Sequence, residues 1–306
     1  MSTVSAHEIA SAYEIAMALE RADASARVLG ARALAARHGP GPAAAFSALA
    51  AAGPEGLVPP VGTGGALAAR HLQHAALVAA SAGEALPADV GDALAHAATA
   101  ARAQAGGANA LDPRGAAIAV RREVAAVRGL AADAMPRDAR WHAMRLGTFL
   151  PRAGWMSALL MACADVAHAD PAAADGVWQA AALVAGADGM PGAEHVMLTL
   201  LADGDHPVSV AHAVDRVTGA LFALSRGGGA DAGPLALARA TAARISTAGS
   251  GNLTVPTDAA VVGEVLDAIG AIAGSIRLGG GGGDAARGAR GASRVRGAQA
   301  QQPMAA

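Results

Sequence analysis

The sequence is 306 residues long, and 53% of these residues are hydrophobic although only 2% are aromatic. Because most of the apolar residues are alanine, a strong helix former, this composition indicates an all-helical protein. The formal charge of −2 provides no basic field for nucleic acid or an acidic membrane. The absence of lysine excludes Schiff-base chemistry and a P-loop lysine.

Helix signals follow one another along most of the chain. Ser5 and Glu8 form a capping box, which predicts a long helix over 5–37. Asp112-Pro113 and His206-Pro207 are predicted helix starts, because proline suits the first turn. The other predicted helices span 43–51, 65–83, 88–105, 113–132, 138–168, 171–185, 191–201, 207–225, 234–247 and 257–277. No strand pattern competes with them.

Residues 1–277 are predicted to form one helical domain, and residues 278–306 a disordered tail. The tail is rich in glycine and arginine and has no apolar periodicity, so it cannot bury enough apolar area to fold. Its arginines lack aromatic neighbours, so no nucleic-acid partner is expected. The stretch "VGTGGAL" at 61–67 has no preceding strand and no following lysine, and we interpret it as a linker.

The location of the chain is predicted from what its sequence lacks. The N-terminus has no basic and then apolar signal pattern, and no long apolar run indicates a membrane span. The single cysteine, Cys163, lies in an apolar run, which is typical of a buried, unreactive thiol. We therefore expect a cytoplasmic protein without a membrane partner.

The stretch "ALERADASAR", residues 18–27, concentrates charge in an alanine-rich region. On a helix, Glu20, Asp23 and Arg27 share one stripe with apolar residues, whereas Arg21 falls on the opposite, solvated face. If the stripe is buried, the two carboxylates must find an arginine or a ligand. Two interpretations stay open: an ion network that fixes helix packing, or a ligand or partner site.

The residues Leu19 to Asp23, followed by Ala26-Arg27, resemble the motif of the bacterial alpha-E domain family. That family is all-helical and carries the motif twice, and "MPRDARWHAMRLGTFLPRAGW" at 135–155 resembles the second copy. In that copy, the positions of the charged residues are held by Pro151, Gly154 and Ala158. The resemblance implies a multi-helix bundle with a degenerate internal duplication of the helical motif.

A duplicated motif predicts that its two helices pack side by side. We therefore expect the helix over 5–37 to lie along the helix over 138–168, so that Arg152 approaches Glu20 or Asp23. Pro151 removes a hydrogen bond from the second helix and is expected to kink it.

Alpha-E proteins resemble accessory components of systems with an ATP-grasp amide ligase and, often, a transglutaminase-like protease. The resemblance therefore implies a non-catalytic or accessory protein with these two partners, and a ligand or partner site at Glu20, Asp23, Arg27 and Arg152. One alternative is an enzyme of amide-bond metabolism that uses Glu20 and Asp23, with an arginine binding an anionic group. Another is a structural helical protein whose second motif has decayed. No metal is expected, because the chain has no Glu-x-x-His pattern, and no cofactor is expected either.

Overall fold

The structure is a computed structural model that describes residues 4–38, 40–54, 63–106, 112–187, 189–226, 232–249 and 255–276. All regular secondary structure in these ranges is helical, which confirms the predicted all-helical fold. The elements are α1 (Ala6–His38), α2 (Pro40–Ala52), α3 (Gly64–Ser81), η1 (Gly83–Ala85), α4 (Ala88–Gly106), α5 (Pro113–Ala134), α6 (Ala139–Ala169), η2 (Pro171–Ala173), α7 (Ala174–Ala185), α8 (Ala193–Ala202), α9 (Val210–Arg226), α10 (Ala232–Gly249) and α11 (Val255–Ser275).

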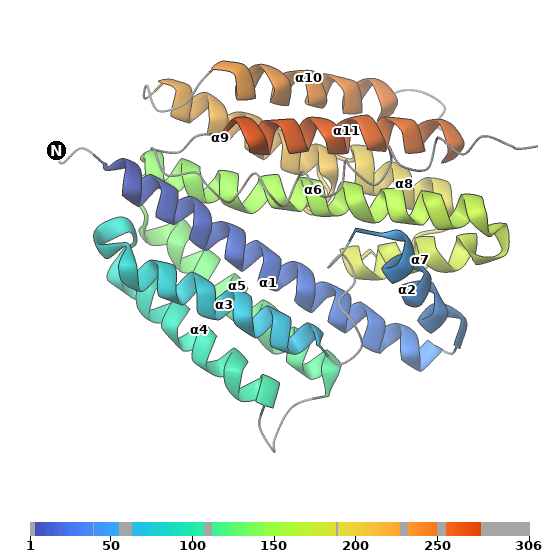
Figure 1. Cartoon of the computed structure of the whole chain (residues 1–306), viewed down its shortest axis with the longest axis horizontal. Coiled ribbons are helices and arrows are strands. Elements are labelled where there is room, and N and C mark those ends of the chain that lie inside the picture. Colours follow the sequence, from blue (N-terminus) through green and yellow to red (C-terminus); the bar gives the residue numbers. More distant parts are fainter. Residues whose placement is uncertain are drawn as a thin grey trace, which may run out of the picture.

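The long helices α1 and α6 cross the middle of the molecule (Figure 1). α3 and α5 pack against α1, and α4 packs against both of them. On the other side, α9 and α11 pack against α6, and α10 covers α9 and α11. The short helices α2, α7 and α8 pack near one end of α6 (Figure 1). The two long helices therefore form the boundary between two groups of helices.

α1 and α6 lie side by side and run parallel. Arg140 Nη1 lies 3.3 Å from Glu8 Oε1 near their N-termini, and Arg152 contacts Glu20 further along. Both pairs join residues 132 positions apart, so the two helices keep a constant register. The predicted packing is confirmed, whereas the internal duplication behind it stays a prediction.

Gly147 of α6 allows this close approach. A Cβ atom at this position would lie 2.2 Å from the backbone oxygen of Tyr13 on α1, a distance that no side chain tolerates. α6 continues through Pro151, which has no N–H to donate to the Gly147 carbonyl. The proline therefore lies inside the helix, and the predicted kink stays a prediction.

The predicted start of a helix at His206-Pro207 is wrong, because α9 begins at Val210. Ser209 decides the position: its Oγ accepts a hydrogen bond from the backbone N–H of His212 at 3.0 Å. A serine cap of this kind satisfies a donor that the first turn leaves unpaired. The chain before it forms a tight loop, in which Ser209 Oγ also donates to the backbone oxygen of Asp203.

Four other predictions concern single segments of the chain. The linker interpretation of 61–67 is wrong from Gly64 onward, because α3 starts there, and 61–62 lie outside the described residues. The helix over 171–185 begins with the 3-10 turn η2, which precedes α7. The tail predicted for 278–306 lies outside the described residues. The capping box at the start of α1 is confirmed by both of its hydrogen bonds.

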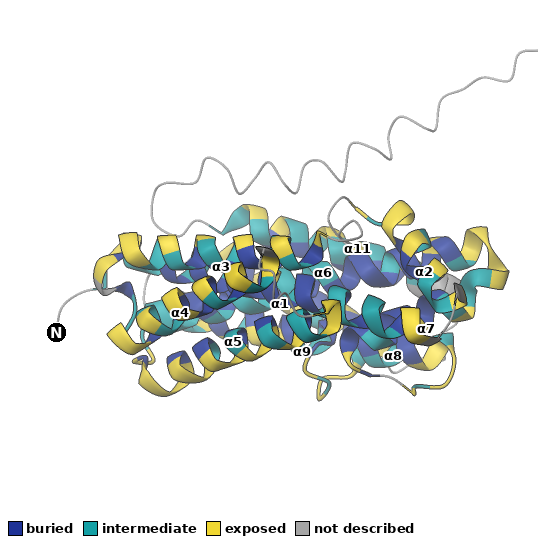
Figure 2. Cartoon of the chain, turned by 90° about the horizontal axis from the view of Figure 1, so that it is seen from below, coloured by how far each residue is buried: buried dark blue, intermediate teal, exposed yellow. Residues whose placement is uncertain are grey.

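The hydrophobic core has two parts, and α1 contributes to both. Its residues from Ala12 to Ala26 belong to the part formed with α3, α4, α5 and the start of α6. Val28, Ala31 and Ala35 belong to the part formed with α2, the rest of α6 and α7 to α11. Buried residues accordingly line the inner faces of the helices, and exposed residues form the outer rim (Figure 2). The middle of α1, where the two parts meet, carries the charged motif.

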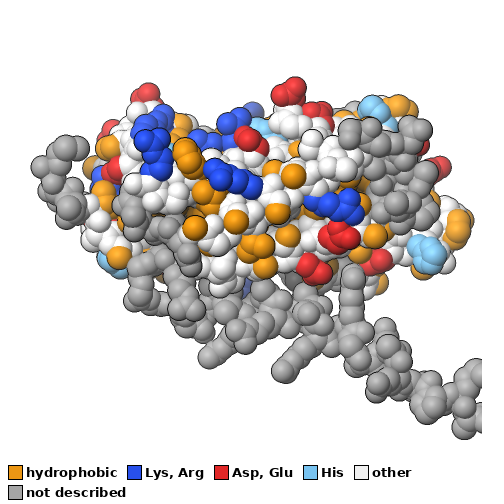
Figure 3. Space-filling view, turned by 90° about the horizontal axis from the view of Figure 1, so that it is seen from above, with side chains coloured by type: hydrophobic (Ala, Val, Ile, Leu, Met, Phe, Trp, Pro, Cys, Tyr) orange, Lys and Arg blue, Asp and Glu red, His pale blue; other side chains and the backbone are white. Residues whose placement is uncertain are grey.

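The described part of the face shown in Figure 3 carries side chains of both charges. On the face shown in Figure 3, the described basic and acidic side chains are interspersed with hydrophobic ones. Among the described helices, none combines the length and the apolar character needed to cross a membrane.

Candidate functional site

α1 places Glu20 and Asp23 almost one turn apart on a buried face, with residue exposures of only 5% and 4%. α5 and α6 both pack along this part of the molecule against α1. The small side chains of Ala16, Ala22 and Ala26 beside the carboxylates are themselves fully buried and let the neighbouring helices come close. Two carboxylates in such a place require cationic partners.

Glu20 is held by arginines from two different helices. Arg152 of α6 donates from Nε to Oε1 at 2.8 Å and from Nη2 to Oε2 at 2.6 Å. Arg128 of α5 donates from Nη2 to Oε2 at 2.5 Å. The two-pronged contact from Arg152 is the strongest geometry that a guanidinium offers a carboxylate. Glu20 thus joins α1, α5 and α6 at one point.

Asp23 is also surrounded by arginines. Arg27 Nε lies 2.9 Å from Oδ2, Arg121 Nε lies 3.4 Å from Oδ1, and Arg128 Nη1 lies 3.7 Å from Oδ2. Burial raises the pKa of the Asp23 carboxyl, but Arg27, Arg128 and Arg121 outweigh it, so the pKa lies below its ordinary value. Asp23 therefore stays ionised at neutral pH.

Arg152 also ties the loop between α8 and α9 to the site. Its Nη1 donates to the backbone oxygen of Pro207 at 3.2 Å, and its guanidinium lies 5.1 Å from the ring centre of Phe149. Burial lowers the pKa of Arg152, but the carboxylate of Glu20 more than offsets this, and the pKa lies above its ordinary value. Arg152 is therefore a permanently charged link between two helices and a loop.

The site carries more positive than negative charge. Four arginines, at 27, 121, 128 and 152, face the two carboxylates, which leaves a surplus of two charges (4 − 2). Arg128 Nε is buried and has no hydrogen-bond partner among the described residues, and neither has Nδ1 of His206 in the loop. Burial lowers the pKa of His206 and outweighs the opposing effect of the Asp203 carboxylate, and Arg27 lowers it further, so the loop imidazole is mainly neutral near pH 7.

The structure brings together all four residues predicted for the site: Glu20, Asp23, Arg27 and Arg152. The predicted contact between Arg152 and Glu20 is confirmed. Arg21 is exposed, as its place on the opposite side of the helix predicts.

Sequence reasoning missed Arg121 and Arg128. They lie seven residues apart on α5, which places them on one side of the helix, next to the buried stripe of Val120, Val124 and Val127. Two arginines bordering an apolar stripe at this spacing are the signal that could have found them.

The site contains no evident nucleophile. Cys163 is fully buried in α6, its thiol lies 3.5 Å from the backbone oxygen of Val177, and burial raises its pKa well above the ordinary value. Within the described residues, no three His, Cys, Asp or Glu side chains gather where they could hold a metal ion. The arrangement is suited to binding and to holding helices together.

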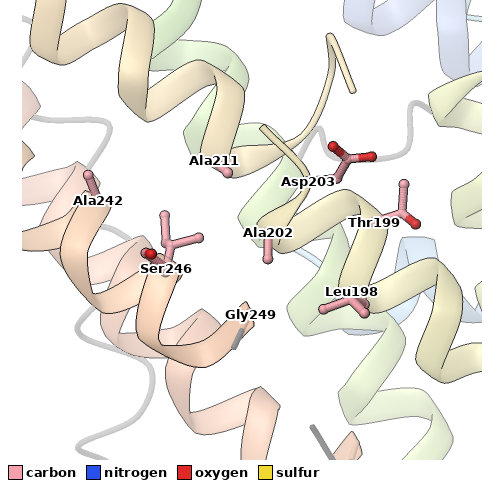
Figure 4. A pocket seen from close by; sticks show the side chains of 9 residues that line it. Leu198, Thr199, Ala202, Asp203, Ala211, Ala242, Ser246 and Gly249 are labelled. Carbon is pink, nitrogen blue, oxygen red and sulfur yellow. The ribbon is translucent and has the colours of Figure 1, made fainter. Parts of the chain in front are cut away.

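A shallow hollow of about 490 Å³ lies elsewhere, between α8, α9 and α10 (Figure 4). Its lining is mostly small and apolar, and Thr199, Asp203 and Ser246 supply its polar side chains. Sequence reasoning did not predict this hollow. Asp203 also begins the loop that reaches the arginine cluster, so the hollow and the cluster flank the same loop.

Comparison with known families matches residues 65–278 to the alpha-E family, described as a predicted alpha-helical domain with a conserved ER motif. The chain therefore belongs to the alpha-E family. No curated protein and no solved structure matches it. The dipeptide Glu-Arg occurs once in the sequence, at Glu20-Arg21, which precedes the matched residues. The matched part supplies Arg121, Arg128, Arg152 and the loop with Pro207, and α1 supplies Glu20, Asp23 and Arg27.

Proposed function

We propose that this alpha-E protein is a non-catalytic accessory protein that acts with an ATP-grasp-type amide or peptide ligase. The observation that supports a non-catalytic role is the engagement of both site carboxylates by arginines. A general acid or base must exchange a proton near neutral pH, whereas the arginines beside Asp23 lower the pKa of its carboxyl. Glu20 accepts three hydrogen bonds from guanidinium groups, so neither of its oxygens is free to act as a base.

The partners in this proposal come from the family resemblance. An ATP-grasp ligase, and a transglutaminase-like protease in the same system, are the proteins with which this chain is proposed to work in the cytoplasm. The cluster around Glu20 is the proposed contact or ligand site, because it gathers charged side chains from three helices and is tied to a loop through the Pro207 oxygen. In this role the chain assists a reaction that the ligase performs.

A purely structural role is the second candidate, since the contact between Glu20 and Arg152 fastens α1 to α6 whether or not a ligand binds. The two roles predict different behaviour for Glu20→Gln. A structural residue affects ligase binding only in proportion to lost stability, whereas a site residue affects binding while the fold persists. Stability and binding must therefore be measured on the same variant.

The test uses the purified chain and the ATP-grasp ligase encoded in the same genome. We expect the chain to bind the ligase and to change its rate of ADP formation, and to show no turnover alone. Glu20→Gln should abolish binding at a temperature where circular dichroism shows it folded. Glu14→Gln is the matched control, because Glu14 is an exposed carboxylate of α1 that pairs only with exposed His74 among the described residues. Absence of ligase binding by the wild type would refute the proposal.

A further inference from the structure

The arginine cluster lies in the angle between α5 and α6, over the middle of α1. Both helices pack against α1, and Figures 1 and 2 show α1 between them. Glu20 and Asp23 form the floor of this region, and the loop that contains Pro207 closes one side through its contact with Arg152. Arg121 lies toward solvent, with 46% of its side chain exposed, whereas 26% of the Arg128 side chain is exposed. The cluster is therefore buried at its base and reachable at its outer edge.

The four arginines divide into two roles. Arg152 uses its Nε and both terminal nitrogens in contacts with Glu20 and the Pro207 oxygen, so its donors are largely occupied. By contrast, the described contacts of Arg27 and Arg121 each use only Nε, toward Asp23. Each of these two guanidinium groups keeps its terminal N–H groups for another acceptor.

A network that served only to hold helices together would balance its charges. Here two positive charges are in surplus. Arg121 reaches solvent, but the side chains of Arg27, Arg128 and Arg152 lie largely buried beside a low-polarity core, where an uncompensated cation is costly. The buried Nε of Arg128 and the buried Nδ1 of His206 have no partner among the described residues. An anion bound here would balance the surplus positive charge and accept a hydrogen bond from the unpaired Arg128 Nε–H. These two features are therefore those expected of an anion-binding site without its ligand.

We propose that Arg27, Arg121 and Arg128 bind an oxyanion, a carboxylate or phosphoryl group of a ligand, above Asp23. The inference rests on the proposed function, because it names the chemical class of the ligand at the same site. Arg152 and Glu20 act as positioning residues that fix Arg128 and the loop. The ligand supplies the negative charge that the described part of the chain lacks at this point.

The test is a titration of the full chain at pH 7 and constant ionic strength, followed by the NMR signals of the arginine Nε–H groups. Inorganic phosphate and glutarate are the two probes, so that the phosphoryl and carboxylate sources are distinguished. We expect saturable binding of at least one probe, with the signal of Arg128 Nε among those that shift. Phosphate alone binding assigns a phosphoryl ligand, and glutarate alone binding assigns a carboxylate.

Arg121→Gln should weaken binding roughly tenfold, the effect of losing one charged donor, because its side chain contacts the ligand. Arg122→Gln is the matched control, since it removes the same charge from the next position of α5, where the residue is exposed. Arg121→Lys should bind more tightly than Arg121→Gln but less tightly than the wild type, since lysine keeps the charge but lacks the paired N–H donors of the guanidinium. Arg27 and Arg128 still pair with Asp23 in the Arg121 variants, and the side chain of Arg121 is half exposed. The thermal stability of all three variants should therefore stay close to that of the wild type.

Absence of saturable binding with both probes, or an equal loss in Arg121→Gln and Arg122→Gln, would overturn the inference. Equal losses would mean that the probes respond to overall charge rather than to this site. The outcome is separable from the ligase experiment: probe binding without ligase binding would retain the oxyanion site and reject the accessory role. Ligase binding without probe binding would retain the accessory role and reject the oxyanion site.

Discussion

Replacing Arg152 by methionine tests how strongly the ion network holds the two long helices together. Methionine keeps much of the apolar stem but removes both hydrogen bonds to Glu20 and the one to the Pro207 oxygen. Each hydrogen bond to a charged group contributes about 1.5–3 kcal/mol, so the two bonds to Glu20 set a range of about 3–6 kcal/mol. Because Arg128 still pairs with Glu20, we expect a loss at the low end, about 3 kcal/mol.

The assay is urea unfolding followed by circular dichroism, which yields the free energy of unfolding. Arg21→Met is the control, because Arg21 is an exposed arginine of α1 and its loss should change the free energy by less than about 0.5 kcal/mol. Combining Arg152→Met with Glu20→Gln should recover part of the loss, with a coupling energy of at least about 1.5 kcal/mol. A loss below about 1 kcal/mol for Arg152→Met would show that water screens the network and that our burial argument is wrong.

Three further predictions use the same unfolding assay. Gly147→Ala should lower the free energy of unfolding by about 3 kcal/mol, because the new methyl group would overlap the Tyr13 backbone oxygen. Gly129→Ala, in open space on α5, should instead raise it by about 0.5–1 kcal/mol. Equal effects of the two substitutions would contradict the close approach of α6 to α1. Asp23→Asn should be much less stable than the wild type at pH 7. The difference in stability between the two proteins should narrow as the pH falls below 3.8, the ordinary pKa of Asp, because the Asp23 carboxyl stabilises the fold only while it is ionised. A difference that widens at low pH would contradict this prediction. Ser209→Ala should lose about 1–2 kcal/mol with its cap of α9, and an unchanged free energy would show that the cap is dispensable.

The sequence predicted the helices well because their composition and capping residues act locally. The capping box at the start of α1 and the Asp112 cap of α5 appear where the pattern placed them. The start of α9 was placed too early, because proline at 207 permits a helix start but the hydroxyl of Ser209 determines it. Local rules thus find elements reliably and place their ends less reliably.

The site was predicted where two helices shared a recognisable motif and missed where they did not. Glu20 and Arg152 were connected by the spacing of the motif copies, and the structure joins them. Arg121 and Arg128 belong to no motif, and their meeting with Asp23 depends on how α5 crosses α1. The contact with the Pro207 oxygen depends on the path of a loop, which no local pattern specifies.

The sharing of α1 between the two parts of the core has a consequence for how the molecule opens. Neither part can separate without exposing the apolar side of α1, since Ala12 to Ala26 serve one part and Val28 to Ala35 the other. The amide protons of α1 should therefore exchange with solvent only when the whole fold is lost. Those of α10, which covers the outside of α9 and α11, can exchange through a local opening. The motif helix is thus expected to be the slowest-exchanging segment of the protein.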